Sequence, residues 1–213
     1  MKLCVKANSR DFSSSSANNE STEVSLGGPK WWRIFDQPFQ NSLEVATKFM
    51  NSGEPVTADI LNKILSIYNI YITDEGLNLL INTPKLKFDN LSVSLHKDPE
   101  FLANLVAGAQ NKDREVKGVY IFTHKNTGSK YVGSSIQLVT RIQRYLAGTH
   151  REYGKFIPFL KGEGLHNFSL EVIPLYSSVI FKSELILEQY FLLDPSFNLN
   201  TSRVVNAPNP NTK

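Results

Sequence analysis

The side chains best suited to chemistry lie in the second half of the chain, and one of them is a carboxylate in an apolar segment. Glu188 lies within residues 185–193, which are apolar on nearly every side of a helix. A buried, ionised carboxylate is strongly destabilising unless a cation or metal compensates it. Alternatively, Glu188 lies on one exposed stripe with Glu184, four residues earlier on the same helix face. The periodicity alone supports both interpretations equally.

A second candidate is an arginine that shares a helix face with a tyrosine. Arg141 and Tyr145 are four residues apart, and Leu138 and Ile142 place an apolar stripe beside them. A guanidinium at the edge of a core is well suited to bind a phosphate. An exposed arginine paired with an acidic side chain would give the same pattern, so both interpretations stay open.

Two tyrosines at corresponding places of a predicted hairpin are the third candidate. Tyr120 ends the tripeptide Gly118-Val119-Tyr120, and Tyr131 begins Tyr131-Val132-Gly133. Side chains of paired strands can bring their phenol oxygens to one side of a sheet. Buried tyrosines more often pack and form hydrogen bonds than take part in catalysis, so a structural role is the alternative.

The elements that would position these side chains form an α+β domain. Residues rich in β-branched and aromatic types flank a turn with Gly128, which predicts a β-hairpin. Ser134 or Ser135 is the expected N-cap of the helix that follows. The predicted strands span residues 118–124, 129–134 and 167–173. The predicted helices run from that cap to Gly148 and over 179–193, and a second helix or a turn is expected over 153–161. This order predicts a small three-stranded antiparallel sheet flanked by helices.

Composition divides the chain into four parts. A serine-rich stretch, residues 1–28, cannot bury enough apolar surface and is expected to be a disordered leader. Residues 29–115 predict a small, mainly helical region of unknown role, with Thr57 and Thr73 at helix starts. The α+β domain is expected over 116–200, and an Asn- and Pro-rich flexible tail over 201–213.

Charge and composition limit the function classes. The chain has 213 residues, of which 41% are hydrophobic and 20% charged, as in an ordinary globular protein. One cysteine excludes a disulfide framework, and no apolar run is long enough for a membrane span. Residues 1–115 carry 12 Lys and Arg against 14 Asp and Glu, whereas 116–203 carry 10 against 6. The basic half points toward a polyanionic partner, although this charge alone does not outweigh the alternative of a solvated surface.

Taken together, these residues resemble the GIY-YIG nuclease family, in the form found in fungal mitochondrial intron-encoded homing endonucleases. Valine replaces isoleucine in both name-giving motifs, a small change of volume. The resembling elements are, in chain order, Gly118-Val119-Tyr120, Tyr131-Val132-Gly133, the small-polar pair Ser134-Ser135 with Leu138 and Arg141, Leu187-Glu188-Gln189-Tyr190-Phe191, and Pro195-Ser196-Phe197-Asn198.

The resemblance implies a metal-dependent endonuclease that hydrolyses phosphodiester bonds in double-stranded DNA. Tyr120 is the implied general base, which requires a depressed phenol pKa, and Tyr131 would orient the attacking water or the phosphate. Arg141 would stabilise the developing charge, and Glu188 would hold one Mg²⁺, for which Mn²⁺ can substitute. The implied catalytic residues are Tyr120, Tyr131, Arg141, Tyr145, Glu188 and Asn198. The expected nucleic-acid-binding residues are Lys130, Arg144, Arg151 and Lys155, of which Lys130 could also act on the phenol or the water.

The chain departs from the family pattern in three places. Many members carry a histidine where Tyr145 stands, with His150 as a substitute in this chain, and Asn200 competes with Asn198 for the closing asparagine. The DNA-recognition region that usually follows the domain would have to be replaced by the N-terminal region, a partner or a further extension.

The resemblance implies a role in homing of an organellar mobile intron and a mitochondrial location, with which the Asn-, Ile- and Ser-rich composition agrees. Two alternatives remain. One is a catalytically degenerate relative that binds nucleic acid, such as intron RNA during splicing. The other is a structure-selective repair nuclease.

Overall fold

The computed structural model describes residues 31–105, 116–150, 154–176 and 179–206, and for residues 31–36 it describes the backbone only. The predicted leader and Arg151 lie outside the described residues, as does the stretch 207–213. None of the helices in the described parts of the chain is long and apolar enough to cross a bilayer.

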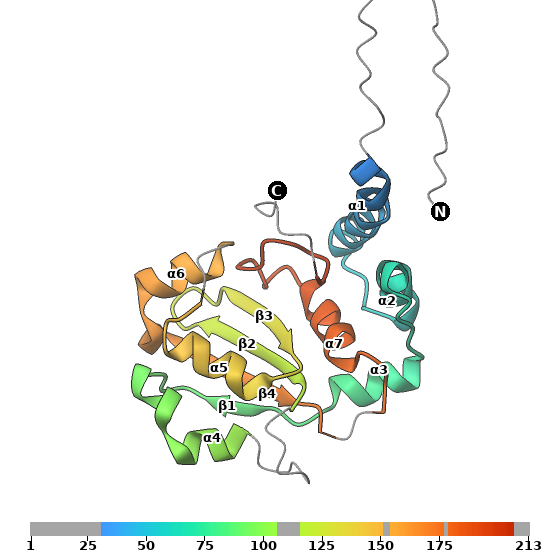
Figure 1. Cartoon of the computed structure of the whole chain (residues 1–213). Coiled ribbons are helices and arrows are strands. Elements are labelled where there is room, and N and C mark those ends of the chain that lie inside the picture. The colour runs from blue at the N-terminus through green and yellow to red at the C-terminus, as the bar shows by residue number, and fades with distance from the viewer. Residues whose placement is uncertain (1–30, 106–115, 151–153, 177–178, 207–213) are drawn as a thin grey trace, which may run out of the picture.

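Helices and one short strand make up the first half of the described chain (Figure 1). In order they are α1 (Trp31–Met50), α2 (Ala58–Leu65), the 3₁₀ helix η1 (Ser66–Tyr68), α3 (Asp74–Ile81), β1 (Leu86–Phe88), the 3₁₀ helix η2 (Val93–Lys97) and α4 (Pro99–Leu105). Thr57 and Thr73 cap α2 and α3, as predicted, by accepting from the backbone N–H groups of Ile60 and Gly76.

The second half follows the predicted order of elements. It contains β2 (Gly118–His124), β3 (Lys130–Ser135), α5 (Leu138–Leu146), α6 (Phe156–Glu163), the 3₁₀ helix η3 (Leu165–Asn167), β4 (Phe168–Pro174) and α7 (Ser183–Leu192). Gly128 has the positive φ (70°) that the hairpin turn requires. The predicted serine cap of α5 is wrong, because Gln137 occupies the N-cap position and Ser135 Oγ accepts from the Gln137 N–H in the loop before it.

The sheet has four antiparallel strands in the order β1-β4-β2-β3, which corrects the prediction of three strands. The additional strand, β1, comes from the region that the sequence predicts as mainly helical, and it pairs with β4 from Leu86↔Val172 to Phe88↔Leu170. Only three residues long and preceded by Pro84, it is too short to show the alternation by which strands are recognised.

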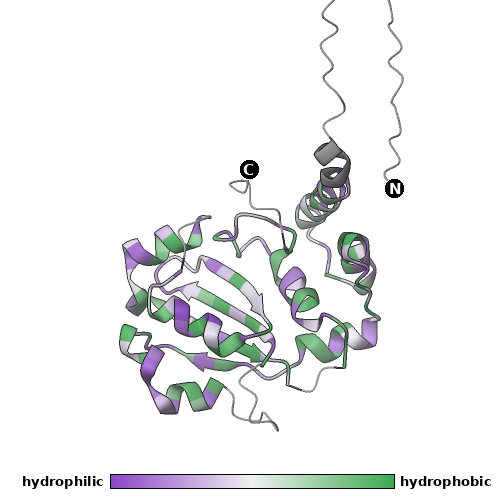
Figure 2. Ribbon diagram, in the orientation of Figure 1, coloured by the Kyte–Doolittle hydropathy of each residue, from purple (hydrophilic) through white to green (hydrophobic). Residues whose placement is uncertain are grey.

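The two faces of the sheet pack against different helices (Figure 1). On one face Val119, Ile121 and Val132 form a core with α7, which lies between the sheet and helices α2 and α3. On the other face, strand side chains such as Phe122 and Leu170 form a core with α4, α5 and α6. Figure 2 shows the hydrophobic residues of the strands and helices that supply these two cores. Successive residues of a strand therefore face different helices, and this decides where each candidate side chain lies.

Residues 201–206, which the sequence assigns to the tail, pack against the protein rather than standing free. Val204 and Val205 are buried, at 2% and 1% exposure. The Gln189 side chain donates to the Arg203 carbonyl (2.9 Å) and accepts from the Val205 N–H (3.1 Å). The Tyr68 hydroxyl donates to the Val205 carbonyl at 2.7 Å, so this segment ties α7 to the N-terminal helices.

Candidate active site

The β2–β3 hairpin brings Tyr120 and Tyr131 to the same face of the sheet. Tyr120 lies opposite Gly133 in the register, and Tyr131 lies opposite Phe122. The two tyrosine rings are 6.3 Å apart between centroids. Gly133 is required here, because a Cβ at that position would lie 2.6 Å from Tyr120 Cζ and closer still to its hydroxyl. Together the two motifs thus build one tyrosine pocket.

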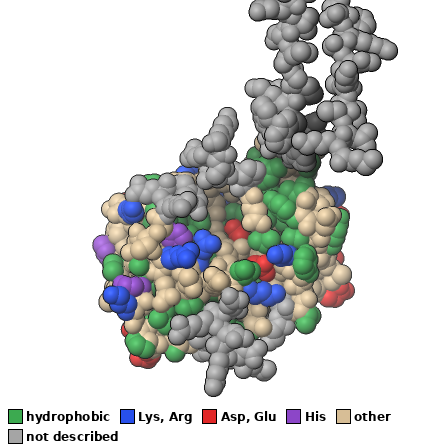
Figure 3. Space-filling view, in the orientation of Figure 1, with side chains coloured by type: hydrophobic (Ala, Val, Ile, Leu, Met, Phe, Trp, Pro, Cys, Tyr) green, Lys and Arg blue, Asp and Glu red, His purple; other side chains and the backbone are tan. Residues whose placement is uncertain are grey.

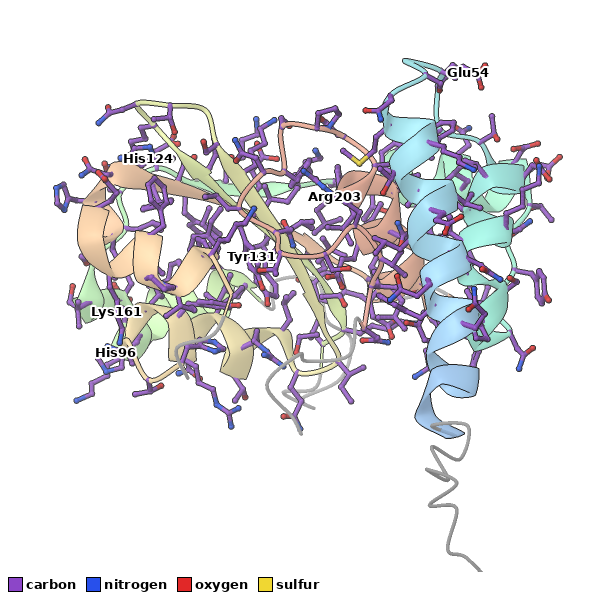
Figure 4. All side chains as sticks on the ribbon, turned by 90° about the horizontal axis from the view of Figure 1, so that it is seen from above. Glu54, His96, His124, Tyr131, Lys161 and Arg203 are labelled. Carbon is purple, nitrogen blue, oxygen red and sulfur yellow. The ribbon has the colours of Figure 1, made fainter. Side chains whose placement is uncertain are left out.

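Helix α5 adds a third phenol to this pair. The Tyr145 hydroxyl lies 3.3 Å from the Tyr120 hydroxyl and 3.1 Å from the Tyr131 hydroxyl, within hydrogen-bond distance of both. The Tyr131 ring stacks on Phe156 of α6, with centroids 4.0 Å apart and an interplanar angle of 5°. In Figure 4, Tyr131 lies near the middle of the molecule. Tyr145, which the sequence places on one helix face with Arg141, thus lies beside the two strand tyrosines.

The environment of the phenols contradicts the expected depression of the Tyr120 pKa. Burial raises the pKa of Tyr120 well above its ordinary value, and the neighbouring phenols raise it further. The charge of Arg141 lowers it but does not reverse the effect. Burial, followed by Tyr145 and the Glu188 carboxylate, likewise raises the pKa of Tyr131. Both phenols therefore keep their protons at neutral pH and can donate hydrogen bonds.

Glu188 approaches from α7 and contacts the edge strand β3 at Ser134, on the face opposite to Tyr131, yet its charge acts on the pKa of Tyr131. The Ser134 hydroxyl donates to Glu188 Oε2 at 2.5 Å, and the Ser134 backbone N–H also donates to this carboxylate. Burial raises the pKa of Glu188 to about 7, with Glu184 adding to the rise, whereas Ser134 and Arg141 oppose it. Glu184 is itself only 4% exposed. The interpretation of an exposed stripe is therefore wrong, and Glu188 is a half-buried carboxylate facing β3.

Arg141 supplies the positive charge of the site. It is half-buried on α5, one turn before Tyr145, and its charge acts on the pKa values of Tyr120, Glu188 and His150. None of the ion pairs found in the described ranges involves Arg141. The sequence left open whether Arg141 pairs with an acidic side chain. Within the described ranges no such ion pair is observed.

His150, expected only as a substitute, belongs to this cluster. Its ring stacks on Tyr145, with centroids 3.8 Å apart and an interplanar angle of 30°. The signal in the sequence was its place just after Gly148, whose positive φ (68°) follows the end of α5 and lets the chain fold back over the last turn of the helix.

Asn198 was expected in the site, but Asn200 is the asparagine that contacts the strand carrying Tyr131. Asn198 is exposed and donates to Ser129 Oγ at 3.3 Å, in the hairpin turn. Asn200 instead holds β3, since its side chain accepts from the Val132 N–H (2.9 Å) and donates to the Val132 carbonyl (2.8 Å). The competing match, Asn200, is therefore the residue that supports the strand carrying Tyr131.

Of the expected nucleic-acid-binding residues, Lys130 lies away from the phenols. Its ammonium lies over the Phe197 ring, 5.6 Å from the centroid, because neighbours on a strand face opposite sides of the sheet. Arg144 and Lys155 are exposed, on α5 and just before α6. Figure 3 shows Lys and Arg side chains gathered beside histidine on the face that α5 occupies in Figure 1.

Glu188 is the residue of this site that could hold a divalent cation. Glu188 has no Lys, Arg or His within ion-pair distance among the residues that the structure describes, so its charge is not compensated by a close partner. The same residues contain no group of three or more His, Cys, Asp or Glu side chains that could hold a metal ion. A hard cation that keeps several waters, such as Mg²⁺, suits a single carboxylate oxygen ligand.

Comparison with known proteins identifies one family. Residues 116–194, just over a third of the chain, match the family model of the GIY-YIG catalytic domain. The chain has no significant match among curated proteins or among solved structures. The match supports nuclease activity at the level of the family, with nucleic acid as the substrate. Residues 116–194, which contain the tyrosine motifs, Arg141 and Glu188, are thus similar to the GIY-YIG catalytic domain.

Proposed function

We propose that this protein is a metal-dependent DNA endonuclease that hydrolyses phosphodiester bonds at the cluster of Tyr120, Tyr131, Tyr145, Arg141 and Glu188. The observation that carries the proposal is this convergence of three phenols, a guanidinium and a carboxylate from β2, β3, α5 and α7. Phosphodiester hydrolysis needs a positioned water, neutralisation of the charge that develops on the phosphoryl oxygens, and help for the leaving oxygen.

The residues of the chain divide this work by their chemistry. The protonated phenols donate hydrogen bonds to a phosphate oxygen or to the attacking water, because burial keeps their protons in place. Arg141 places a fixed positive charge beside the phosphate, where it opposes the developing negative charge. Ser134 holds the Glu188 carboxylate in one orientation through two hydrogen bonds.

Glu188 is the residue that would hold Mg²⁺ or Mn²⁺, and the bound ion would supply charge neutralisation at the scissile phosphate and the leaving oxygen. This part of the proposal rests on the carboxylate, which is held by Ser134 and has no close cationic partner in the described ranges. Outside the pocket, Arg144, Lys155 and Arg151 would contact the phosphates of double-stranded DNA. That assignment is supported by the exposure of Arg144 and Lys155 and by the basic charge of residues 116–203.

For the biological role, we propose homing of a mobile intron in an organellar genome, with a mitochondrial location. The support is the resemblance of the motifs to fungal mitochondrial intron-encoded members, together with the Asn-, Ile- and Ser-rich composition. A non-cutting relative that binds intron RNA is the second candidate. The tyrosine at the position of the family histidine and the raised pKa values of the phenols favour it.

Cleavage of supercoiled plasmid DNA tests the proposal. The protein should nick plasmid with Mg²⁺ or Mn²⁺ and not with EDTA. Arg141→Ala and Glu188→Ala should each lower the rate by about 100-fold or more. Arg144→Ala, on the same helix, should weaken DNA binding in a salt-dependent way and leave the saturated rate largely unchanged. Uncut DNA combined with salt-sensitive retention of RNA would instead support the second candidate.

A further inference from the structure

The segment of residues 91–105 lies outside residues 116–194, yet it shares a hydrophobic core with α5. Leu91, Phe101 and Leu105 are buried in the same core as Leu138 and Ile142 of α5. The 3₁₀ helix η2 lies between these anchors in the chain. Because the residues on both sides of η2 are buried against the domain, η2 has a fixed place beside α5.

Helix η2 is held against one flank of α5. The two helices pack against each other, and the Gln143 side chain donates to the His96 carbonyl at 3.1 Å. In Figure 4, His96 lies on the side of the sheet that α5 covers. Lys97, the last residue of η2, is exposed. Lys97 therefore brings a positive charge to the flank of α5 that carries Gln143.

The geometry of α5 places three cations in a row across this helix. Leu138 and Ile142 face the core, and with 3.6 residues per turn the half-buried Arg141 and Gln143 lie on opposite flanks. The flank of Arg141 is the one toward the phenols, on whose pKa its charge acts. Arg144 is exposed on the outward ridge between the two flanks. Positive charge thus runs from the tyrosine pocket over α5 to η2.

Lys97 differs from the other lysines of residues 31–105 in its surroundings. Lys63, Lys85 and Lys87 are in ion pairs with acidic side chains. Lys48 lies in the last turn of α1, a helix that packs against α2 and not against the site. No ion pair within the described ranges involves Lys97. Among these lysines, Lys97 is therefore the one that can extend the row of cations on α5.

The two acidic residues that follow Lys97 in the chain do not neutralise it. The Asp98 carboxylate accepts from the backbone N–H groups of Glu100 (2.9 Å) and Phe101 (3.1 Å), so it is used at the start of α4. Glu100 lies in the first turn of α4 and is not within ion-pair distance of Lys97. The charge of Lys97 can thus serve an anionic partner.

We propose that η2 extends the DNA-binding surface beyond residues 116–194, with Lys97 in contact with a backbone phosphate of double-stranded DNA. The inference rests on the proposed function, from which it takes duplex DNA as the partner. A helix with its side chains is about 10 Å across, and a duplex carries one phosphate charge per about 1.7 Å of its axis. A duplex that lies across α5 from the tyrosine pocket thus presents phosphates to Arg144 and Lys97 together. Such contacts position the duplex and carry no sequence information.

The salt dependence of DNA binding tests this contact. Fluorescence anisotropy with a labelled duplex, in EDTA so that no cleavage occurs, gives the affinity of the full chain from about 50 to about 200 mM salt. Lys97→Ala should lower the slope of log affinity against log salt concentration by about 1, and the affinity at about 0.1 M salt by about eightfold, because one counterion fewer is released. Lys97→Arg keeps the charge and should keep the wild-type slope.

Lys48→Ala is the matched control, because it removes an equally exposed, unpaired lysine from α1, and it should leave the slope unchanged. The inference is overturned if Lys97→Ala keeps the wild-type slope, if Lys48→Ala lowers the slope as much, or if the loss occurs with RNA and not with duplex DNA. It is also overturned if the wild type does not bind the duplex.

The same measurements separate this inference from the proposed function. A wild type that binds duplex DNA with a slope dependent on Lys97, but does not cut plasmid with Mg²⁺ or Mn²⁺, would refute the nuclease and leave the binding surface in place. A wild type that cuts while Lys97→Ala binds with an unchanged slope would refute the role of η2 alone.

Discussion

The raised pKa of Glu188 gives the structure a stability that depends on pH, and Glu188→Gln should remove that dependence. The carboxyl has a pKa of about 7 in the folded protein against an ordinary value of 4.5. The folded state therefore holds this proton to higher pH than the unfolded chain does. Between these two values the folded state binds more protons, so the free energy of unfolding must fall as the pH rises.

The size of this effect follows from the pKa values. Each pH unit by which a pKa moves corresponds to about 1.4 kcal/mol, so complete ionisation of Glu188 costs about 3 kcal/mol of folding stability. The wild type should have its full stability below pH 4.5 and should have lost this amount by about pH 8. Glu188→Gln keeps an oxygen that can accept from Ser134 and has no proton to lose. Its advantage over the wild type should be small at pH 5 and should grow to about 3 kcal/mol by pH 8.

Urea unfolding in EDTA, at pH 5, 6, 7 and 8, measures the difference between the two proteins. Comparing them at each pH cancels the titration of every other group, provided that the sites are independent. Glu44→Gln, at an exposed position of α1, is the matched control and should parallel the wild type. Parallel curves for wild type and Glu188→Gln across this range would show that the carboxylate is not desolvated, and the argument for an uncompensated charge would fail.

Three further predictions concern the cation and the packing of the site. Saturating Mg²⁺ at pH 8 should raise the thermal midpoint of the wild type and not that of Glu188→Gln, as calorimetry would show; equal shifts would place the ion elsewhere. Gly133→Ala should lower stability by about 1–3 kcal/mol in urea and abolish cleavage, because the new methyl group collides with a buried phenol. Gly162→Ala, where a Cβ meets nothing within 4 Å, should leave both unchanged. Asn200→Ala should cost about 1–3 kcal/mol through the two lost hydrogen bonds to β3, against less than about 0.5 kcal/mol for Asn198→Ala; equal losses would contradict the assigned roles.

The hairpin and the helices of the second half could be predicted because their signals are local. Gly128 marks the turn, and the apolar spacing of α5 marks its buried face. Strand β1 could not be predicted in this way, since three residues show no period and their pairing with β4 is a long-range contact. Lys130 is a different case. Its neighbour Tyr131 faces the phenols, so strand alternation already excluded Lys130 from that side.

The protonation states and hydrogen bonds of the site were harder to predict than the residues that form it. The sequence places Tyr120 in a motif but does not show that Tyr131 and Tyr145 surround its hydroxyl, and it is this burial that raises the pKa. Ser134 was expected as a helix cap, because a serine before a helix commonly has that role. Its use by Glu188 depends on the packing of α7 against β3, which joins residues 54 positions apart. The sequence could not decide whether Asn198 or Asn200 supports the site, because the answer depends on how the chain runs beside β3.

Strand β1 limits where the chain can be truncated if the sheet of residues 116–194 is to stay whole. The recognisable signature begins at residue 116, yet the hydrogen-bonded ladder extends back to Leu86, and Lys85 and Lys87 both neutralise Glu171 on β4. A fragment cut at the signature would leave a bare backbone edge and an unmatched acid on β4, which invites association between copies. A unit that keeps the whole β-sheet therefore starts before Lys85, and grafting or recombination that begins at residue 116 would remove an edge strand.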